Sequence, residues 1–167
     1  MTANTFYLVQ HGRAVDKQEN PERPLSIAGK QETQTIAEYL KKLRLPVSAV
    51  FHSGKLRAQQ TAEIFAAAFS VETSTLPGLA PNDPVGSLIP RLNIENALYI
   101  GHLPQLQKLT DYLLAGSEEA GIIHFQNSAV ICLKQQAQAK TGHPSNTLAV
   151  HYQLAWYLPP TLLTPST

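Results

Sequence analysis

The chain has 167 residues, a length that suits one domain with a hydrophobic core and is short for two. Its formal net charge of +1 and its charged fraction of 15% give no reason to expect nucleic acid as a partner. No stretch approaches the roughly 18 apolar residues of a membrane span, and the N-terminus carries no signal-peptide pattern. We therefore expect a cytoplasmic protein that does not bind membranes. The single cysteine, Cys132, agrees with a reducing compartment, and its apolar surroundings indicate a buried side chain rather than a nucleophile.

The first two thirds of the sequence alternate between short apolar runs and helical periodicity. Gly12 ends the first run, and Ser26 is placed to cap a helix that ends near Pro46, because the residue before proline disfavours helical angles. Pro104 opens a later helix that stops at Gly116. The pattern predicts strands at residues 6–10, 47–52 and 97–101, and helices at residues 26–45, 55–69, 85–92 and 104–115.

The alternation breaks after Gly116. Residues 129–135 and 147–157 read as two strands joined by the turn-rich segment 141–146, which predicts an antiparallel hairpin at the edge of the sheet. The tail, residues 159–167, contains three prolines and is expected to be flexible.

These elements predict an α/β fold with three layers, an α/β/α sandwich whose sheet is mostly parallel and ends in a C-terminal antiparallel hairpin. One domain is expected to span residues 1–167, with a core at about 5–158. In such folds ligands bind beyond the carboxyl ends of the strands.

Three of the predicted parallel strands end in a histidine: His11, His52 and His102. The carboxyl ends of parallel strands meet at one edge, so these residues are expected to converge. Gly12 lets the backbone come close to a bound group, and helix N-termini favour an anion nearby. Arg57 could hold two phosphate oxygens as a fork, although its position alone is equally compatible with a solvated helix surface. The arrangement suggests a phosphate site.

Four segments stand out along the chain: Val9-Gln-His-Gly-Arg-Ala14, Arg23-Pro-Leu-Ser-Ile-Ala-Gly29, His52-Ser-Gly-Lys-Leu-Arg-Ala-Gln-Gln-Thr61 and Ile100-Gly-His-Leu-Pro104. In this order they resemble the successive signatures of the histidine phosphatase superfamily, and their spacing resembles its small SixA-type phosphohistidine phosphatase branch. The resemblance covers most of residues 6–115 and implies a phosphoglycerate mutase-like fold.

The resemblance implies that His11 is the nucleophile, which takes the phosphoryl group and forms a covalent phosphohistidine. It also implies that Arg57 and His102 are catalytic phosphate ligands. A neutral imidazole is nucleophilic near pH 7, and cationic donors stabilise charge on the transferring oxygens. Gly12 and Ser53 are expected to complete the phosphate site. No metal or other cofactor is required, and the sequence has no His-Glu-x-x-His motif.

One position departs from the family pattern, which has an arginine where this chain has Gln10. A glutamine amide can donate to phosphate but carries no charge, and a charged hydrogen bond is stronger by about 1 kcal/mol. Arg13 is the first candidate to replace the missing charge, against the alternative of a solvent-facing side chain. If Arg13 enters the pocket, Arg13→Ala should weaken phosphate or vanadate binding by about tenfold or more, a difference of roughly 1.4 kcal/mol. Gln10→Arg should be tolerated.

Four further residues are candidates for the rim of the pocket. Asp83 could be a proton donor, although an Asx turn before proline also explains it. His52 could line the pocket or be a hydrogen-bonded structural histidine. Asn127 and Ser128 begin the late hairpin and could reach the rim. The remaining histidines show no ligand spacing and read as structural or exposed: His124, His143 and His151.

The sequence therefore predicts a metal-independent phosphatase that removes phosphate from phosphohistidine on a protein, such as a phosphotransfer domain. The short span between Phe69 and Ala97 leaves no room for a large lid, so an open site is expected. Two alternatives remain open. The same residues could hydrolyse small phosphate esters, or the loss of the arginine could mark a non-catalytic phosphohistidine-binding module.

Overall fold

The fold is a six-stranded sheet between two layers of helices, in a computed structural model that describes residues 4–136 and 152–163. The strand order is β3-β2-β4-β1-β5-β6. The pairs β3–β2, β2–β4 and β4–β1 are parallel, whereas β1–β5 and β5–β6 are antiparallel. This confirms the predicted mostly parallel sheet with an antiparallel C-terminal pair. The strands are β1 (Thr5–Gln10), β2 (Ala49–His52), β3 (Thr73–Thr75), β4 (Ala97–Gly101), β5 (Val130–Gln135) and β6 (Tyr152–Leu158).

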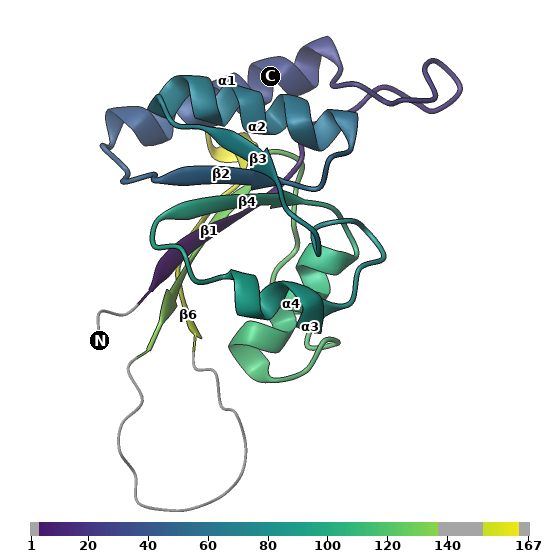
Figure 1. The fold of residues 1–167 in the computed structure, drawn as a ribbon. Coiled ribbons are helices and arrows are strands. Elements are labelled where there is room, and N and C mark those ends of the chain that lie inside the picture. The colour runs from purple at the N-terminus through teal and green to yellow at the C-terminus, as the bar shows by residue number, and fades with distance from the viewer. Residues whose placement is uncertain (1–3, 137–151, 164–167) are drawn as a thin grey trace, which may run out of the picture.

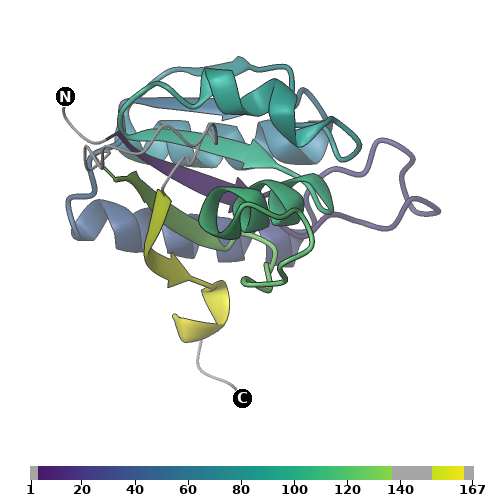
Figure 2. The same cartoon turned by 90° about the horizontal axis from the view of Figure 1, so that it is seen from below.

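The helices cover both faces of the sheet and complete the predicted three layers. Figure 1 shows α1 and α2 above the sheet and α3 and α4 below it, and Figure 2 shows the sheet between these layers with β6 at one side. The α-helices are α1 (Ile27–Lys42), α2 (Leu56–Phe69), α3 (Val85–Leu88) and α4 (Gln105–Ala115), and two 3-10 turns are η1 (Ile89–Arg91) and η2 (Pro160–Leu162).

Strand β1 is buried on both faces, as its unbroken apolar sequence predicts. Phe6 and Leu8 pack in a core beneath the sheet that includes residues of α3 and α4. Tyr7 and Val9 pack in a second core against α1 and α2. Because both faces are filled, β1 is held in position by two cores, and it delivers His11 to the carboxyl edge of the sheet.

The helix ends follow from local sequence. The hydroxyl of Ser26 accepts a hydrogen bond from the backbone N–H of Gly29 at 3.0 Å and caps α1, as expected. Gly29 must be a glycine, because an added Cβ would lie 2.0 Å from the carbonyl oxygen of Arg13. Gly116 takes a left-handed conformation and ends α4. Helix α1 therefore begins in direct contact with the segment that follows His11.

Three differences separate the structure from the sequence-based elements. Strand β3 was not predicted, because Thr73–Thr75 has no apolar pattern. The single helix expected at 85–92 is the short α3 followed by the 3-10 turn η1. The described part of the tail, residues 159–163, forms η2 with Pro160 buried beside α1. The predicted turn at 141–146, the start of the last strand at 147–151 and residues 164–167 lie outside the described residues.

Candidate active site

His11 and His102 meet at the carboxyl edge of the sheet because β1 and β4 are neighbouring parallel strands. The backbone N–H of His11 donates to the carbonyl of Gly101 at 3.1 Å, which continues the strand ladder into the site. The centroids of the two imidazole rings lie 4.8 Å apart. Both side chains are buried, with 9% of His11 and 1% of His102 exposed. The predicted convergence of these two histidines is thus present in the fold.

The hydrogen bonds of His11 define which ring nitrogen is free. Nδ1 lies 2.7 Å from the carbonyl oxygen of Gly12, and a carbonyl can only accept, so Nδ1 carries the proton. Nε2 then presents its lone pair and accepts from Nε of Arg57 at 3.2 Å. Burial is the main cause that lowers the pKa of His11 to about 4; the bond to Gly12 opposes the shift, and the charges of Arg57 and Arg23 contribute to it. His11 is therefore a neutral base near pH 7.

His102 is held by Ser53, which follows β2. The Ser53 hydroxyl and Nε2 of His102 are 2.6 Å apart. Burial lowers the pKa of His102 to about 2, and the neighbouring His11, Arg57 and Lys55 act in the same direction. Its Nδ1 is buried and has no hydrogen-bond partner among the described residues. The second imidazole is also neutral near pH 7, so it can interact with a phosphoryl group by hydrogen bonding rather than by charge.

Thr61 in α2 links the backbone of Arg57 to the backbone next to His11. The sequence did not single out this residue. The Thr61 hydroxyl donates to the carbonyl of Arg57 at 2.7 Å and accepts from the N–H of Gly12 at 2.9 Å. Thr61 is fully buried. We refer to His11, Gly12, Arg57, Thr61 and His102 as the floor of the site.

Asn127 and Ser128 hold the backbone of His11 from the side of β5. The Asn127 amide donates to the carbonyl of His11 at 2.9 Å, and the Ser128 N–H donates to the carbonyl of Gln10 at 3.0 Å. The Ser128 hydroxyl is 2.8 Å from that of Thr33 in α1. Both residues therefore contact the backbone of Gln10 and His11.

Arg13 and Arg23, which follow Gln10 in the sequence, have different partners in the structure. Arg13 forms an ion pair with Glu32 at 3.1 Å, and 61% of its side chain is exposed. Arg23 donates from Nε to the carbonyl of Val15 at 3.2 Å, and its charge lowers the pKa of both His11 and His102. Gln10 is buried, and its amide oxygen has no partner in the described part of the chain. The charges that act on the two imidazoles therefore include those of Arg57 and Arg23, whereas that of Arg13 is directed at Glu32.

Two of the rim candidates have local structural partners. His52 is buried, and its Nδ1 accepts from the N–H of Gly54 at 3.1 Å. The carboxylate of Asp83 accepts from the N–H groups of Gly78 and Ala80 at 3.0 and 2.9 Å. The bond of His52 is the kind expected of a hydrogen-bonded structural histidine. The carboxylate of Asp83 also has a structural partner, but it accepts from residues that precede it and does not form the Asx turn that the sequence suggested. His124 is exposed, and His143 and His151 lie outside the described residues.

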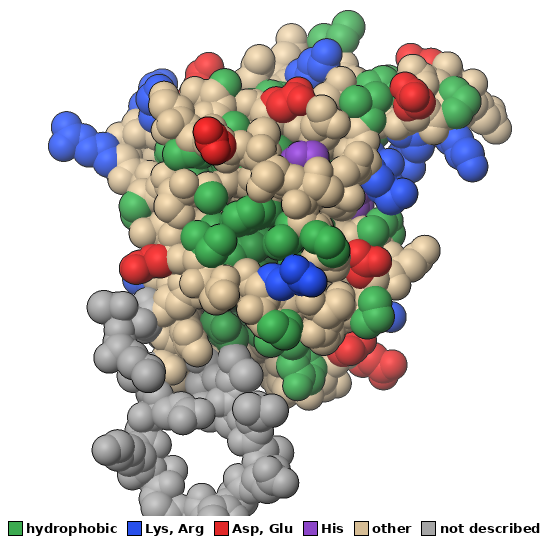
Figure 3. Space-filling view, viewed as in Figure 1, with side chains coloured by type: hydrophobic (Ala, Val, Ile, Leu, Met, Phe, Trp, Pro, Cys, Tyr) green, Lys and Arg blue, Asp and Glu red, His purple; other side chains and the backbone are tan. Residues whose placement is uncertain are grey.

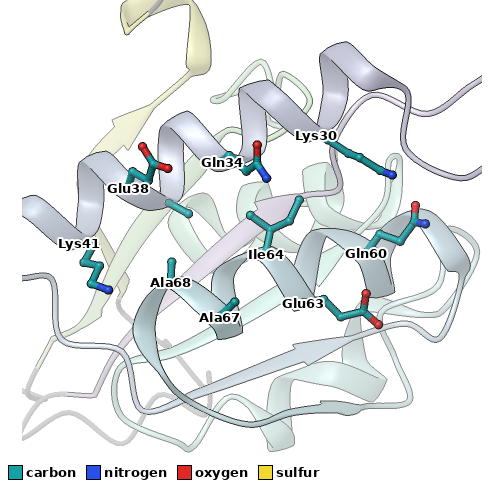
Figure 4. A pocket seen from close by; sticks show the side chains of 10 residues that line it. Lys30, Gln34, Glu38, Lys41, Gln60, Glu63, Ile64, Ala67 and Ala68 are labelled. Carbon is teal, nitrogen blue, oxygen red and sulfur yellow. The ribbon is translucent and has the colours of Figure 1, made fainter.

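Two hollows lie on the surface, and one of them adjoins His11. The first, which we call the rim hollow, has a volume of about 300 Å³ and is lined by Arg13, Glu32, Gln126, Asn127, Pro160 and Thr161. It adjoins His11 because Asn127 also donates a hydrogen bond to the His11 carbonyl. A larger groove of about 580 Å³ lies between α1 and α2, and its lining includes the apolar residues Ile64 and Ala68 (Figure 4). Lys and Arg side chains gather at the edge where the strands end, near a partly visible histidine (Figure 3).

The described residues contain no group of three or more His, Cys, Asp or Glu side chains that could hold a metal ion. None of their helices combines the length and the apolar character needed to cross a membrane. Besides the effect of His11 on His102, the charges that lower the pKa values of the two imidazoles are those of Arg57 and Arg23 and, for His102, Lys55. An anion is the ligand that this distribution favours.

Comparison with known proteins identifies the class. The family model of the histidine phosphatase superfamily (branch 1) matches residues 6–82. The phosphohistidine phosphatase SixA of Escherichia coli is 31% identical over 118 residues, which cover 65% of this chain and 71% of SixA. An uncharacterized protein of Picosynechococcus is 29% identical over 92% of this chain and 99% of that protein. The chain therefore belongs to the histidine phosphatase superfamily, and it is a phosphatase by that membership.

Solved structures place the chain more narrowly. The structure of SixA complexed with tungstate has a TM-score of 0.77 and 25% identity, and the match covers 96% of this chain and 99% of that one. A SixA-named structure from Agrobacterium tumefaciens, at 18% identity, has a TM-score of 0.73 over 96% of this chain and all of that one, which supports the fold alone. The chain belongs to the SixA-type branch, and its fold is the phosphoglycerate mutase-like one.

Proposed function

We propose that this chain removes phosphate from phosphohistidine on a protein, through a covalent phosphohistidine on His11. The observation that carries the proposal is the hydrogen bonding of the His11 ring. Nδ1 is fixed by Gly12, so Nε2 is the nucleophilic nitrogen, and it lies beside the guanidinium of Arg57. The low pKa of about 4, caused mainly by burial, keeps this nitrogen unprotonated near pH 7.

The reaction divides into two steps. In the first, the guanidinium of Arg57 moves from Nε2 of His11 to the phosphate oxygens. The freed Nε2 lone pair attacks phosphorus, and the P–N bond to the substrate breaks with its electron pair going to the leaving imidazole. In the second, water attacks the phosphorus of phospho-His11, and inorganic phosphate and free His11 are released. Arg57 and Arg23 would stabilise the charge on the transferring oxygens, with Gln10, Ser53 and His102 as neutral hydrogen-bonding groups.

The leaving group that fits this floor is one that needs no strong acid. A phosphohistidine ring can take a proton from solvent on its second nitrogen and then depart as neutral imidazole. An alkyl ester instead leaves as an alkoxide unless an acid protonates it. In the described residues, no carboxylate is hydrogen-bonded to His11, Arg57 or His102, and Asp83 is occupied by the backbone of its own loop. This favours phosphohistidine over small esters.

The partner that we propose is a protein of the phosphotransfer-domain type, which presents its phosphohistidine on a surface during signal transduction. The SixA name of the relative from Escherichia coli supports this substrate class. A cytoplasmic location is part of the proposal, because the single cysteine, Cys132, is free and buried in β5.

Incubation with a histidine-phosphorylated phosphotransfer protein and with a panel of phosphate esters tests the proposal. We expect phosphate release from the phosphoprotein and at least tenfold lower kcat/KM for the esters. We also expect a base-stable, acid-labile phosphoenzyme to form on the wild-type chain and to be absent from His11→Ala. The exposed His124 provides the matched control: His124→Ala should still release phosphate from the phosphoprotein and still form the phosphoenzyme.

The alternatives give different results. Faster release from esters would support the small-molecule phosphatase. Binding of the phosphoprotein without release would support the binding module. A His11→Ala variant with normal activity would contradict the mechanism itself.

A further inference from the structure

Four hydrogen bonds link His11, Gly12, Thr61 and Arg57 in a closed ring. His11 Nδ1 donates to the Gly12 carbonyl, and the Gly12 N–H donates to the Thr61 hydroxyl. The Thr61 hydroxyl donates to the Arg57 carbonyl, and Arg57 Nε donates to His11 Nε2. The ring joins both nitrogens of the nucleophile to one backbone segment and one helix.

The hydroxyl of Thr61 can be arranged in this ring in only one way. A hydroxyl has a single proton, and the carbonyl of Arg57 takes it because a carbonyl cannot donate. The remaining lone pairs of the oxygen are then available to the N–H of Gly12. Gly12 is itself buried, so water cannot replace Thr61 as the hydrogen-bond acceptor of this N–H. Thr61 therefore fixes the orientation of the Gly12 peptide.

The orientation of the peptides around Gly12 determines where the His11 ring points. The Gly12 carbonyl holds Nδ1, so a rotation of this segment would turn the ring and move Nε2 away from Arg57. The side chains around Gly12 leave little space for its backbone to move, since an added Cβ would lie 2.6 Å from the Thr33 hydroxyl and 3.0 Å from Leu25. The side-chain amide of Asn127 and the backbone N–H of Ser128 hold the His11 and Gln10 carbonyls, but neither bonds to the Gly12 N–H.

We infer that Thr61 is a positioning residue for the phosphoryl transfer: its hydroxyl aligns Nε2 of His11 with the guanidinium of Arg57. This inference rests on the proposed role of His11 as the nucleophile. Thr61 does not touch the reacting atoms, so its effect is on kcat and on the rate of phosphoenzyme formation, not on recognition of the partner protein.

Thr61→Val tests the inference, because valine keeps the shape of threonine and removes only the hydroxyl. We expect kcat and the single-turnover rate of His11 phosphorylation to fall at least tenfold, with KM changed less than threefold. Thr61→Ser keeps the hydroxyl and should recover at least half of the wild-type kcat. Thr61→Ala, assayed in the same way, replaces Thr61→Val if the valine variant does not fold.

Thr110 provides a matched control. It is also fully buried in a helix, and its hydroxyl donates to the carbonyl four residues earlier, Leu106, at 2.8 Å, but it accepts nothing from the site. Thr110→Val should lower the melting temperature about as much as Thr61→Val and leave kcat unchanged.

The outcomes separate the inference from the proposed function. Equal kcat for Thr61→Val and wild type, in a wild-type enzyme that depends on His11, overturns the inference and leaves the function intact. A kcat loss in Thr61→Ser as large as in Thr61→Val also overturns it, because the methyl packing would then be responsible. A wild-type chain that forms no phosphoenzyme contradicts the proposed function instead.

Discussion

The floor of the site and the rim hollow adjoin each other but are built in different ways. The floor consists of buried or half-buried groups joined by hydrogen bonds between β1 and α2, with the two imidazoles at its centre. The rim hollow is bordered by an ion pair, Arg13–Glu32, whose arginine is 61% exposed, and by the described end of the chain at η2. The difference suggests a division of roles, in which the floor sets the chemistry and the rim can vary with the partner.

Gly12→Ala should break the floor and have the largest effect. The new Cβ would lie 2.6 Å from the Thr33 hydroxyl, so either Gly12 or α1 must move. Overpacking of this kind lowers the free energy of unfolding by about 2 kcal/mol, and the shift should lower kcat at least tenfold. Urea unfolding and steady-state kinetics measure both effects.

Gly86→Ala is the control for that substitution, because nothing lies within 4 Å of its added Cβ. It should leave both stability and kcat close to those of the wild type. Wild-type kinetics in Gly12→Ala would mean that the floor tolerates movement and is no more rigid than the rim.

Arg23→Ala tests whether the charge of Arg23 contributes to anion binding at the floor. The charge of Arg23 reaches both imidazoles and Arg57, so its removal should weaken vanadate binding about tenfold, which corresponds to roughly 1.4 kcal/mol. Isothermal titration with vanadate measures the affinity.

Arg13→Ala is the matched variant in the same loop. An exposed arginine that is already paired with Glu32 contributes little to a neighbouring site, so we expect less than a threefold change in affinity. This differs from the tenfold effect that the sequence alone suggested for Arg13. A larger loss in Arg13→Ala than in Arg23→Ala would reverse the assignment and make the rim arginine part of the phosphate site.

Acid should destabilise the free enzyme through the two imidazoles of the floor. The pKa values of His11 and His102 are lowered by burial from the usual 6.5 to about 4 and about 2. Between pH 6.5 and pH 4 the unfolded chain takes up protons on these histidines and the folded chain does not, so stability falls as pH falls. The slope is about 1 kcal/mol per pH unit for each histidine.

Urea unfolding between pH 7 and pH 4 tests this expectation, with His102→Gln as the comparison because it removes one of the two titrating groups. The slope of the variant should be shallower than that of the wild type. Identical slopes would show that the burial of His102 does not govern the acid response.

Much of the fold could be predicted because the apolar runs and helix boundaries have clear local causes. Strand β4 was predicted with its observed bounds; Ser26 caps the start of α1 and Gly116 ends α4, as expected. Strand β3 gave no signal, since three polar residues pair with β2 at the edge of the sheet without an apolar face of their own. Its pairing is a tertiary effect.

The chemistry-bearing residues of the site were easier to find than the residues that hold them. His11 and His102 follow apolar strands, and Arg57 follows in a recognisable segment. Thr61 gave no separate signal, because a buried helical threonine that bonds to its own helix looks the same whether or not a second group donates to it, as Thr110 shows. Nearness in sequence favoured Arg13 over Arg23, but the chain turns after Gly12 and directs Arg13 toward α1.

The spacing of the two imidazoles has a consequence for how such a site can change. Their centroids are 4.8 Å apart, and neighbouring strands in any sheet lie about 4.7–4.9 Å apart. The separation of the two imidazoles thus matches the repeat distance of the sheet, and β1 and β4 are hydrogen-bonded neighbours. Loops around the edge could be exchanged to fit another phosphorylated partner while this distance stays the same, which makes the rim the natural place for redesign.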